Sequence, residues 1–432
     1  MQTIEAWTMI PFGLMLLLIA VLPLAFPKFW ESNRNKLICT LILAVPTAIY
    51  LICAGFGHEL SHQIFGDYVP FIILLLSLFV VTGGIQIKGD IEASPLTNSI
   101  LLSAGYILAS FMGTTGAAML LIRPLLEINK QRTHKTHTVL FFIAMVANAG
   151  GMLTPLGDPP LFLLYLRGAP FIWFSSLFPQ WLFVGVILLI IYAVWDSIMV
   201  RKEPLEARKA DITEHSPIRI KGRINFAFIA LILLAVIFLN EQFIPEMGKE
   251  NCPIPVKYLR EIVLVGITLL SLRFTSKQVR KSNNFNFEPI IEVGVLFIGI
   301  FVTMTPALMF LREHAGAMGL TKPWQFYYCT GALSSFLDNS PTAIAFHSVA
   351  TGLHPVALPG FIAGIPPTLL KAISLGAVFF GSMTYIGNGP NFMVKAIAEQ
   401  HNVKMPSFFG YIGKFSLPVL LPVLILVQVI FL

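Results

Sequence analysis

Apolar runs of membrane-spanning length recur along this chain, and they constrain its fold more than any other feature. A helix needs about 20 consecutive apolar residues to cross the hydrocarbon core of a bilayer. Of the 432 residues, 56% are hydrophobic and only 12% are charged, whereas about a quarter of a soluble globular chain is charged. The sequence therefore predicts an all-α polytopic membrane protein, and we expect no β-strands.

Four of these runs are interrupted by glycine, proline and polar residues. The interruptions fall at 113–116, 148–160, 337–342 and 384–391. Glycine and proline weaken or break the hydrogen-bond ladder of a helix, which leaves backbone N–H and C=O groups without partners. In a bilayer such groups are tolerated only where protein or a polar cavity satisfies them. We therefore expect the four interruptions to converge.

The runs form two series of six on either side of a charged linker. The first series is expected to hold spans at 7–26, 37–56, 68–87 and 180–200, an interrupted hairpin at 97–128 and a broken helix at 137–166. The second series has spans at 224–244, 257–272, 289–311 and 406–432, a hairpin at 323–350 and a broken helix at 367–400. Residues 110–118 align with 335–343 without a gap, and 156–160 align with 386–390. We predict two repeats, 1–200 and 224–432, joined by a basic cytoplasmic linker at 201–223.

The positions of lysine and arginine test the topology, because these residues collect in cytoplasmic loops. The basic loops fall on one side when both interrupted hairpins enter and leave the membrane on the same face. The chain is therefore predicted to have about ten transmembrane helices, two re-entrant hairpins and two broken helices, with both termini outside. The two repeats are then inverted, an arrangement typical of secondary transporters whose site lies at the midplane. No cleavable signal peptide is expected, because residues 2–7 lack a basic stretch.

Two carboxylates at the interruptions are the main candidates for cation binding. Asp338 stands beside Asn339 and Ser340, and Asp158 precedes a pair of prolines at the facing interruption. An acid at the centre of a membrane helix costs about 2.5–3.5 kcal/mol on insertion scales, and such acids are usually functional. We predict that Asp338 and Asp158 bind sodium or a proton, with neutral oxygens from Asn339 and Ser340. The alternative is that each acid caps the helix that follows it.

Other polar residues at the interruptions are candidate ligands. They are Thr114, Thr115, Asn148, Thr154, Asn388 and Asn391. Their oxygens could complete the shell of a cation or satisfy unwound backbone, although the Gly-Thr-Thr-Gly sequence is also consistent with a plain turn. Glu292 is either a proton-relay acid or an interfacial side chain. Arg123 and Lys371 are expected to extend from helix ends toward the interface.

Two of the interrupted segments resemble the ion transporter superfamily, which includes D-type sodium/proton antiporters, arsenite permeases, citrate carriers and dicarboxylate/sodium symporters. The Asn-Ala-Gly-Gly-Met-Leu-Thr-Pro-Leu-Gly-Asp-Pro-Pro stretch at 148–160 is similar to a motif of antiporters and arsenite permeases. The Asp-Asn-Ser-Pro stretch at 338–341 is similar to the D-type antiporter signature. The dicarboxylate branch has Ser-Asn-Thr at both hairpin tips, whereas this chain has Gly-Thr-Thr and Asp-Asn-Ser. The break at 385–391 also departs from the antiporter pattern, which keeps a citrate-transport branch open.

The resemblance and the acids together predict a secondary active transporter. We expect a sodium/proton antiporter, because no Lys or Arg stands at a hairpin tip to balance an anionic substrate. The alternative is a citrate or other carboxylate or oxyanion transporter coupled to a cation, including citrate carried with a metal. The resemblance further implies the bacterial cytoplasmic (inner) membrane and a homodimer.

Several classes of function are not expected. The sequence shows no nucleophile–base pair or phosphate loop, so an enzyme is not predicted. The four Cys residues, and His134, His137, His347 and His354, match no metal-ligand spacing. We expect no cofactor beyond sodium and protons as transported or coupling ions. The expected partners are membrane lipid and a small ion or carboxylate, and nucleic acid is not implied by the net charge of +7.

Overall fold

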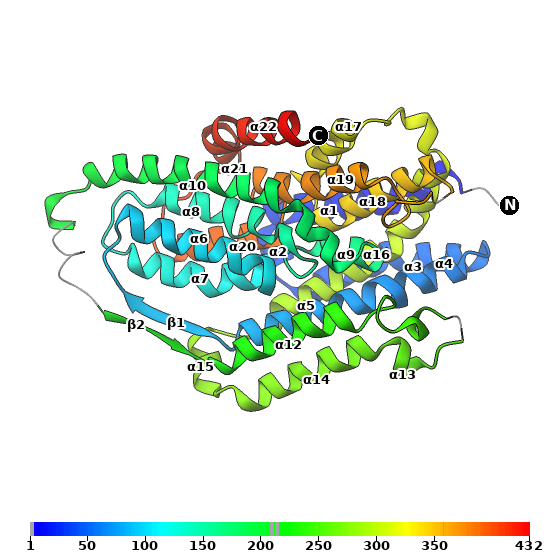
Figure 1. Cartoon of the computed structure of the whole chain (residues 1–432), viewed down its shortest axis with the longest axis horizontal. Helices are drawn as coiled ribbons and strands as arrows, with labels where there is room; N and C mark the ends of the chain where they lie inside the picture. The colour runs from blue at the N-terminus through cyan, green and yellow to red at the C-terminus, as the bar shows by residue number, and fades with distance from the viewer. Residues whose placement is uncertain (1–3, 208–210, 212–215, 250, 357) are drawn as a thin grey trace.

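The computed structural model describes residues 4–207, 211, 216–249, 251–356 and 358–432, and helices make up most of it (Figure 1). Eight of the described helical segments are long and apolar enough to cross a membrane: Ala6–Pro23, Asn33–Cys53, Gly57–Thr82, Pro95–Met112, Thr136–Leu153, Phe171–Arg201, Glu288–Glu313 and Phe408–Phe431. The prediction of a helical polytopic membrane protein is therefore confirmed. The number of crossings and the inverted orientation of the two halves stay predictions.

The helices of the two halves follow the order expected from the apolar runs. The first half holds α1 (Ile10–Ala25), α2 (Pro27–Trp30), α3 (Asn33–Cys53), α4 (Gly57–Ser61), α5 (Val69–Thr82), α6 (Pro95–Met112), α7 (Thr114–Ile128), α8 (Thr136–Met145), α9 (Pro159–Leu166) and α10 (Phe178–Arg201). The second half holds α12 (Ile224–Phe238), α13 (Ile254–Lys257), α14 (Leu259–Phe274), α15 (Lys277–Ser282), α16 (Glu288–Glu313), α17 (Pro323–Ser334), α18 (Asn339–Leu353), α19 (Pro367–Phe380), α20 (Gly389–Gln400), α21 (Phe408–Tyr411) and α22 (Leu421–Phe431).

A two-stranded sheet corrects the expectation that the chain has no strands. Strand β1 (Gln86–Asp90) pairs antiparallel with β2 (Ser216–Lys221), in a register that sets Ile87 opposite Ile220. Both strands are short, and each completes its backbone hydrogen bonds only by pairing with a segment far away in the sequence. Strands this short carry too few residues for a clear alternation of apolar and polar side chains, so the sequence does not predict them. The span expected at 68–87 ends earlier, at Thr82, because β1 begins at Gln86. Strand β2 lies in the linker expected at 201–223, and residues 208–210 and 212–215 of that linker lie outside the described residues.

The predicted interruptions coincide with helix ends. Gly113 alone separates α6 from α7, and its φ of 82° is a conformation that glycine adopts without strain. In the second half, α17 ends at Ser334 and α18 begins at Asn339. Helices α8 and α19 are each followed by a short 3₁₀ turn, Ala149–Leu153 and Gly381–Met383, before α9 and α20 begin.

Equivalent contacts recur at the aligned positions of the two halves. The hydroxyl of Thr154 donates to the carbonyl of Ser110, and the hydroxyl of Thr384 donates to the carbonyl of Ser335. A Cβ on Gly157 would meet the carbonyl oxygen of Gly151, and a Cβ on Gly387 would meet that of Gly381. The matched contacts agree with the repeat that the sequence predicts, and the repeat itself stays a prediction.

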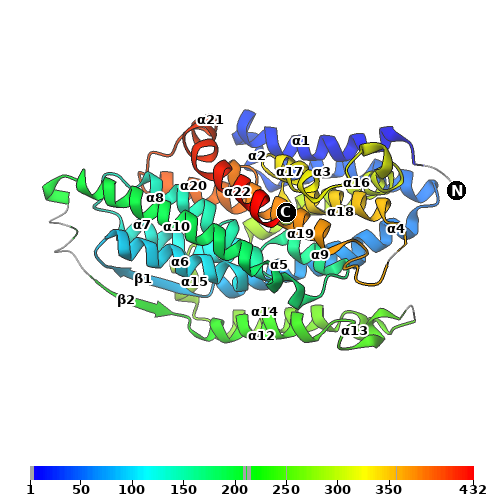
Figure 2. The ribbon, with the colours of Figure 1, turned by 45° about the horizontal axis from the view of Figure 1, so that its top comes forward.

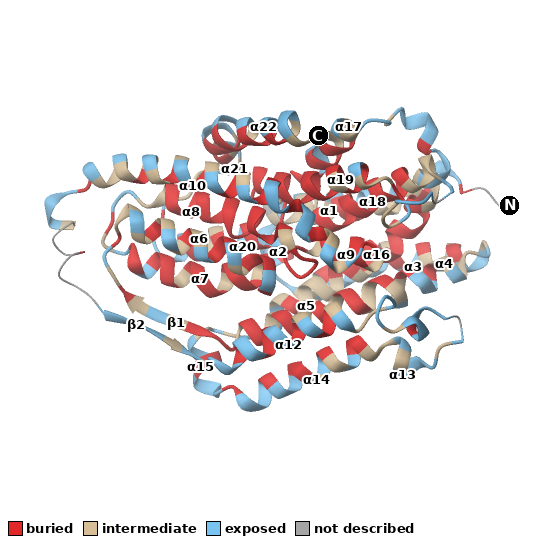
Figure 3. Cartoon of the chain, viewed as in Figure 1, coloured by how far each residue is buried: buried red, intermediate tan, exposed pale blue. Residues whose placement is uncertain are grey.

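Helices α7, α8, α9, α18 and α19 lie mostly in the interior, and longer helices surround them. Every residue of α8 from His137 to Met145 is buried, as expected for a helix that is apolar on all sides (Figure 3). In contrast, α1, α3 and α10 expose large apolar side chains such as Ile10, Ile42 and Ile190, which suits contact with lipid. Helices α12 and α14 lie together along one edge of the molecule in both views (Figures 1 and 2).

A buried ionic cluster joins the loop after α7 to α10. Arg132 Nη2 lies 2.7 Å from Asp196 Oδ1, and His137 Nε2 lies 2.8 Å from the same oxygen. Asn98, at the start of α6, donates to Asp196 Oδ2 over 3.4 Å. Asp196 is fully buried, so its charge depends on these partners. The cluster fixes the base of the α6–α7 hairpin against α10.

Removing the Asp196 carboxylate should therefore destabilise the protein strongly. Asp196→Ala leaves the buried guanidinium of Arg132 without its main partner, a loss that typically costs about 3–5 kcal/mol. Glu399→Ala, which removes an exposed pair with Lys395, should cost at most about 1 kcal/mol. Thermal unfolding of the full chain in neutral detergent measures both. Equal melting temperatures for the two variants would contradict the assigned role of the cluster.

Candidate functional site

The four interruptions meet at the carboxylate of Asp158. The hydroxyl of Thr114 donates to Asp158 Oδ1 over 2.8 Å, and Asn388 Nδ2 donates to the same oxygen over 3.2 Å. Asn339 Nδ2 donates to Asp158 Oδ2 over 2.9 Å. Asp158 is only 1% exposed. One residue from each interrupted segment therefore takes part in a single hydrogen-bonded group.

The local sequence explains why this carboxylate points inward. Asp158 precedes Pro159, the first residue of α9, and its extended backbone leaves the side chain free of any bond to that helix. The N–H of Thr114 donates to the carbonyl of Gly157 over 2.7 Å, which fixes the tip of the first hairpin to the turn before α9. Asp158 therefore does not cap α9 through its side chain, which instead bonds to residues of the other interrupted segments.

Asparagine amides link the two broken helices around this carboxylate. Asn148 Nδ2 donates to Asn391 Oδ1 over 2.7 Å, and Asn388 Nδ2 lies 3.2 Å from Asn148 Oδ1. Asn391 also donates to the carbonyls of Gly381 and Thr384, and Asn148 donates to that of Ile143. The three asparagines thus satisfy backbone carbonyls that the interruptions leave free.

Asp338 occupies a different position from Asp158. Its Oδ1 accepts the N–H of Ser340 over 2.9 Å, so it caps α18. The sequence left open whether Asp338 caps the helix that follows it, and this contact is present. The side chain is half-buried and also lines a cavity. Ser340 is buried beside it. Within the described residues, no Lys, Arg or His nitrogen lies within 4.0 Å of either acid.

A cavity of about 590 Å³ lies against the hairpin tips. Thr114, Thr115, Asp338 and Asn388 line one wall, and residues of α1, α3, α5 and α16 line the other. Most of its lining is apolar. The charged side chains on its wall are Glu31, Lys36, Glu292 and Asp338, which gives an excess of acids.

The predicted relay residue Glu292 pairs with a lysine that the sequence did not single out. Lys36 Nζ lies 2.7 Å from Glu292 Oε1, and the lysine side chain is 5% exposed against 38% for the glutamate. The span expected at 37–56 left Lys36 in a loop, but α3 begins at Asn33, so Lys36 lies in its first turn. The packing of α3 on α16 brings it to Glu292. Glu292 therefore lies on the cavity wall with a cationic partner.

Two further predicted site residues, Thr115 and Thr154, lie at or near the hairpin tips. Thr115 lines the cavity at the tip of the first hairpin. Thr154 is buried, and its oxygen accepts the N–H of Leu156 while its hydroxyl holds the carbonyl of Ser110, so it fixes the turn before Asp158. Ser334 was missed; its hydroxyl donates to Asn339 Oδ1 over 2.6 Å and so orients the amide toward Asp158.

Comparison with known proteins gives one family and two distant relatives. A family model described as "Putative citrate transport" matches residues 1–432. An uncharacterized transporter of Methanocaldococcus jannaschii is 22% identical over 304 residues, which cover 68% of this chain and 66% of that protein. An uncharacterized transporter of Synechocystis is 24% identical over 311 residues, 65% of each protein. The chain thus spans slightly less than two thirds of the length of the curated relatives it matches.

The turn before Asp158 gives a test of the site geometry. A Cβ on Gly157 would lie 2.0 Å from the carbonyl oxygen of Gly151, so Gly157→Ala must displace the turn that positions the carboxylate. Overpacking of this kind typically costs about 1–3 kcal/mol. Gly389→Ala is the matched control, because a Cβ there meets nothing within 4 Å. Melting temperatures in detergent should fall for the first variant and not for the second; an unchanged Gly157→Ala protein would show that the turn is not tightly packed.

Proposed function

The chain belongs to the citrate-transport family whose model it matches from end to end, and from that premise we propose a secondary active transporter in which Asp158 binds the coupling cation or proton. The observation that carries the proposal is the state of this carboxylate. It is buried, it lies where four helix interruptions meet, and its bonded partners are the neutral side chains of Thr114, Asn339 and Asn388.

A buried charge without a counter-charge is costly even when neutral groups donate to it. Hydrogen bonds from hydroxyl and amide groups reduce this cost without cancelling the charge. Two species remove it: a proton, which neutralises the acid, and a cation, which pairs with it. Sodium suits the site, because hard cations prefer carboxylate, amide and hydroxyl oxygens.

Sodium/proton exchange follows from competition at one carboxylate. Asp158 holds either a proton or a sodium ion, so loading one species on one side of the membrane requires release of the other. The site belongs to both halves of the chain, since Thr114 precedes the linker and Asn339 and Asn388 follow it. This is the position expected for a transporter that exposes one site alternately to the two sides.

A cation-coupled carboxylate carrier is the second candidate, and two observations favour it. The family description concerns citrate transport, and the cavity of about 590 Å³ beside the tips is far larger than a sodium ion needs. Lys36 gives that cavity one cationic side chain, while Glu31, Glu292 and Asp338 disfavour a bare carboxylate. A carboxylate that travels with a cation, or as a metal complex, reduces this repulsion.

Transport in proteoliposomes tests both candidates. Sodium-dependent dissipation of an imposed pH gradient supports exchange, and sodium- or proton-dependent uptake of labelled citrate supports the carboxylate carrier. Asp158→Asn keeps the size of the side chain and removes its charge, so either activity should fall about 10- to 100-fold, as expected for a lost charged contact to the coupling ion. Glu399→Gln, which neutralises an exposed acid paired with Lys395 outside the site, serves as the control. Undiminished transport by Asp158→Asn would refute the proposed role of this acid.

A further inference from the structure

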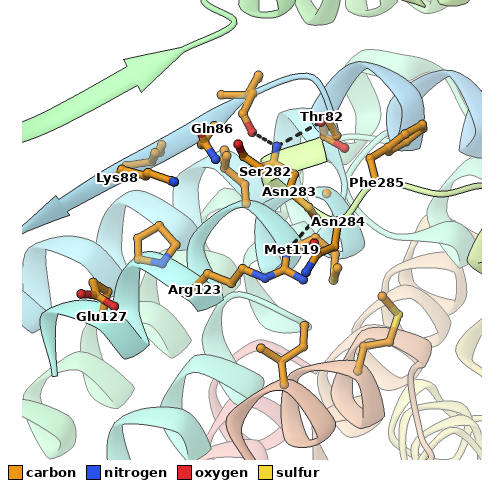
Figure 4. A pocket seen from close by; sticks show the side chains of 18 of the residues that line it. Thr82, Gln86, Lys88, Met119, Arg123, Glu127, Ser282, Asn283, Asn284 and Phe285 are labelled. Atoms are coloured by element: carbon orange, nitrogen blue, oxygen red, sulfur yellow. Dashed lines mark hydrogen bonds between the residues drawn. The ribbon is translucent and has the colours of Figure 1, made fainter. Parts of the chain in front are cut away.

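A second cavity, of about 790 Å³, adjoins the tip of the first hairpin (Figure 4). The charged side chains among its described lining residues are Lys88, Arg123 and Glu127, an excess of cations where the first cavity has an excess of acids. The second cavity lies between α7, β1, the segment 282–289 and α20. It shares Thr115 and Gly116 with the cavity described above, so the two spaces meet at the hairpin tip. Its walls belong to the side on which the basic loops are predicted to be cytoplasmic. We call this space the vestibule.

Two cations on the vestibule wall have no acidic partner. Within the described part of the chain, no carboxylate oxygen lies within 4.0 Å of Arg123 or Lys88. The acid that shares this wall, Glu127, is already paired with Lys130 over 3.1 Å. The vestibule therefore presents uncompensated positive charge, in a concave space that concentrates anions.

The guanidinium of Arg123 is held in place and still has free donors. Its Nη1 donates to the carbonyl of Asn283 over 3.0 Å, while Nε and Nη2 bond to none of the described residues. Asn283 is itself fixed, because its amide donates to the carbonyls of Gly83 and Ile85. Figure 4 shows Arg123 extending from α7 toward Asn283 and Asn284. A planar guanidinium fixed at one nitrogen is suited to bind a carboxylate through the others.

We propose that the vestibule is an anion-binding site in which Arg123 and Lys88 hold a small di- or tricarboxylate between the first hairpin tip and the cytoplasmic solution. The inference rests on the second proposed function, a cation-coupled carboxylate carrier. It adds a binding position for the carboxylate that is distinct from Asp158. The vestibule attracts the carboxylate, whereas the acid-lined cavity beyond Thr115 attracts its cation. The two charges of a coupled substrate are thus drawn to opposite sides of one hairpin tip.

Equilibrium binding of radiolabelled citrate to the purified full chain in neutral detergent tests this site. The measurement is made in the Asp158→Asn background, where the central carboxylate carries no charge. Arg123→Gln should weaken citrate binding about 10- to 100-fold, as expected for charged hydrogen bonds. Arg123→Lys, which keeps the charge without the planar donors, should bind citrate with intermediate affinity. The matched control is Arg273→Gln, an exposed cation at the end of α14 that does not line the vestibule.

Lys88→Gln provides a second variant that leaves the fold intact, because Lys88 is exposed on β1. Lys88→Gln should lower the affinity for citrate several-fold, and raised salt should weaken citrate binding to the unsubstituted chain.

Equal affinities for Arg123→Gln and Arg273→Gln, or no citrate binding at all, would overturn the site. Displacement of citrate by an equal concentration of inorganic phosphate, or by phosphatidylglycerol in mixed micelles, would assign it to phosphates or lipid headgroups instead. These results are independent of transport by Asp158→Asn, so the two proposals can fail separately.

Discussion

The need to satisfy broken backbone inside an apolar protein organises this structure. Each interruption frees N–H and C=O groups in a region where water is scarce, and each such group must find a partner. Asn148 and Asn391 supply partners for carbonyls beside the breaks, and Thr154 and Thr384 do so at equivalent places in the two halves. Asn388 connects these contacts to Asp158, because its amide donates to the carbonyl of Ala147, to Asn148 Oδ1 and to Asp158 Oδ1. The site is therefore a consequence of how the interruptions are made compatible with burial.

Charge is distributed unevenly around this centre. The central acid has neutral partners, the adjoining cavity carries more acids than bases, and the vestibule carries unpaired cations. Thr115 and Gly116 line both spaces, so one hairpin tip separates fields of opposite sign. Fields in low-dielectric surroundings are weakly screened. A cation near Asp158 and an anion near Arg123 would lower each other's energy across the tip.

The sequence predicts some parts of this arrangement because their signals are local. Gly113, the prolines after Asp158 and the proline after Ser340 are visible against apolar surroundings, and the helices end beside them. The relative roles of the two acids were not predictable in the same way. Asp338 caps its own helix through a contact two residues away, whereas the position of Asp158 depends on three segments that pack together only in the folded protein. The pairing of β1 with β2 and of Lys36 with Glu292 likewise depends on contacts between distant segments.

The hydrogen bonds of Asp158 indicate how binding at one carboxylate could alter the whole arrangement. Its oxygens hold Thr114 from one hairpin, Asn339 from the other and Asn388 from a broken helix. A proton on either oxygen turns an acceptor into a donor, so at least one of these three bonds must rearrange. A cation requires oxygens where amide N–H groups now point, which reverses the amides of Asn339 or Asn388. Because Asn148 and Ser334 bond those two amides, each reversal is passed on to the helices behind them. In the transporter that we propose, these few bonds would link occupancy of the site to the relative position of the two halves.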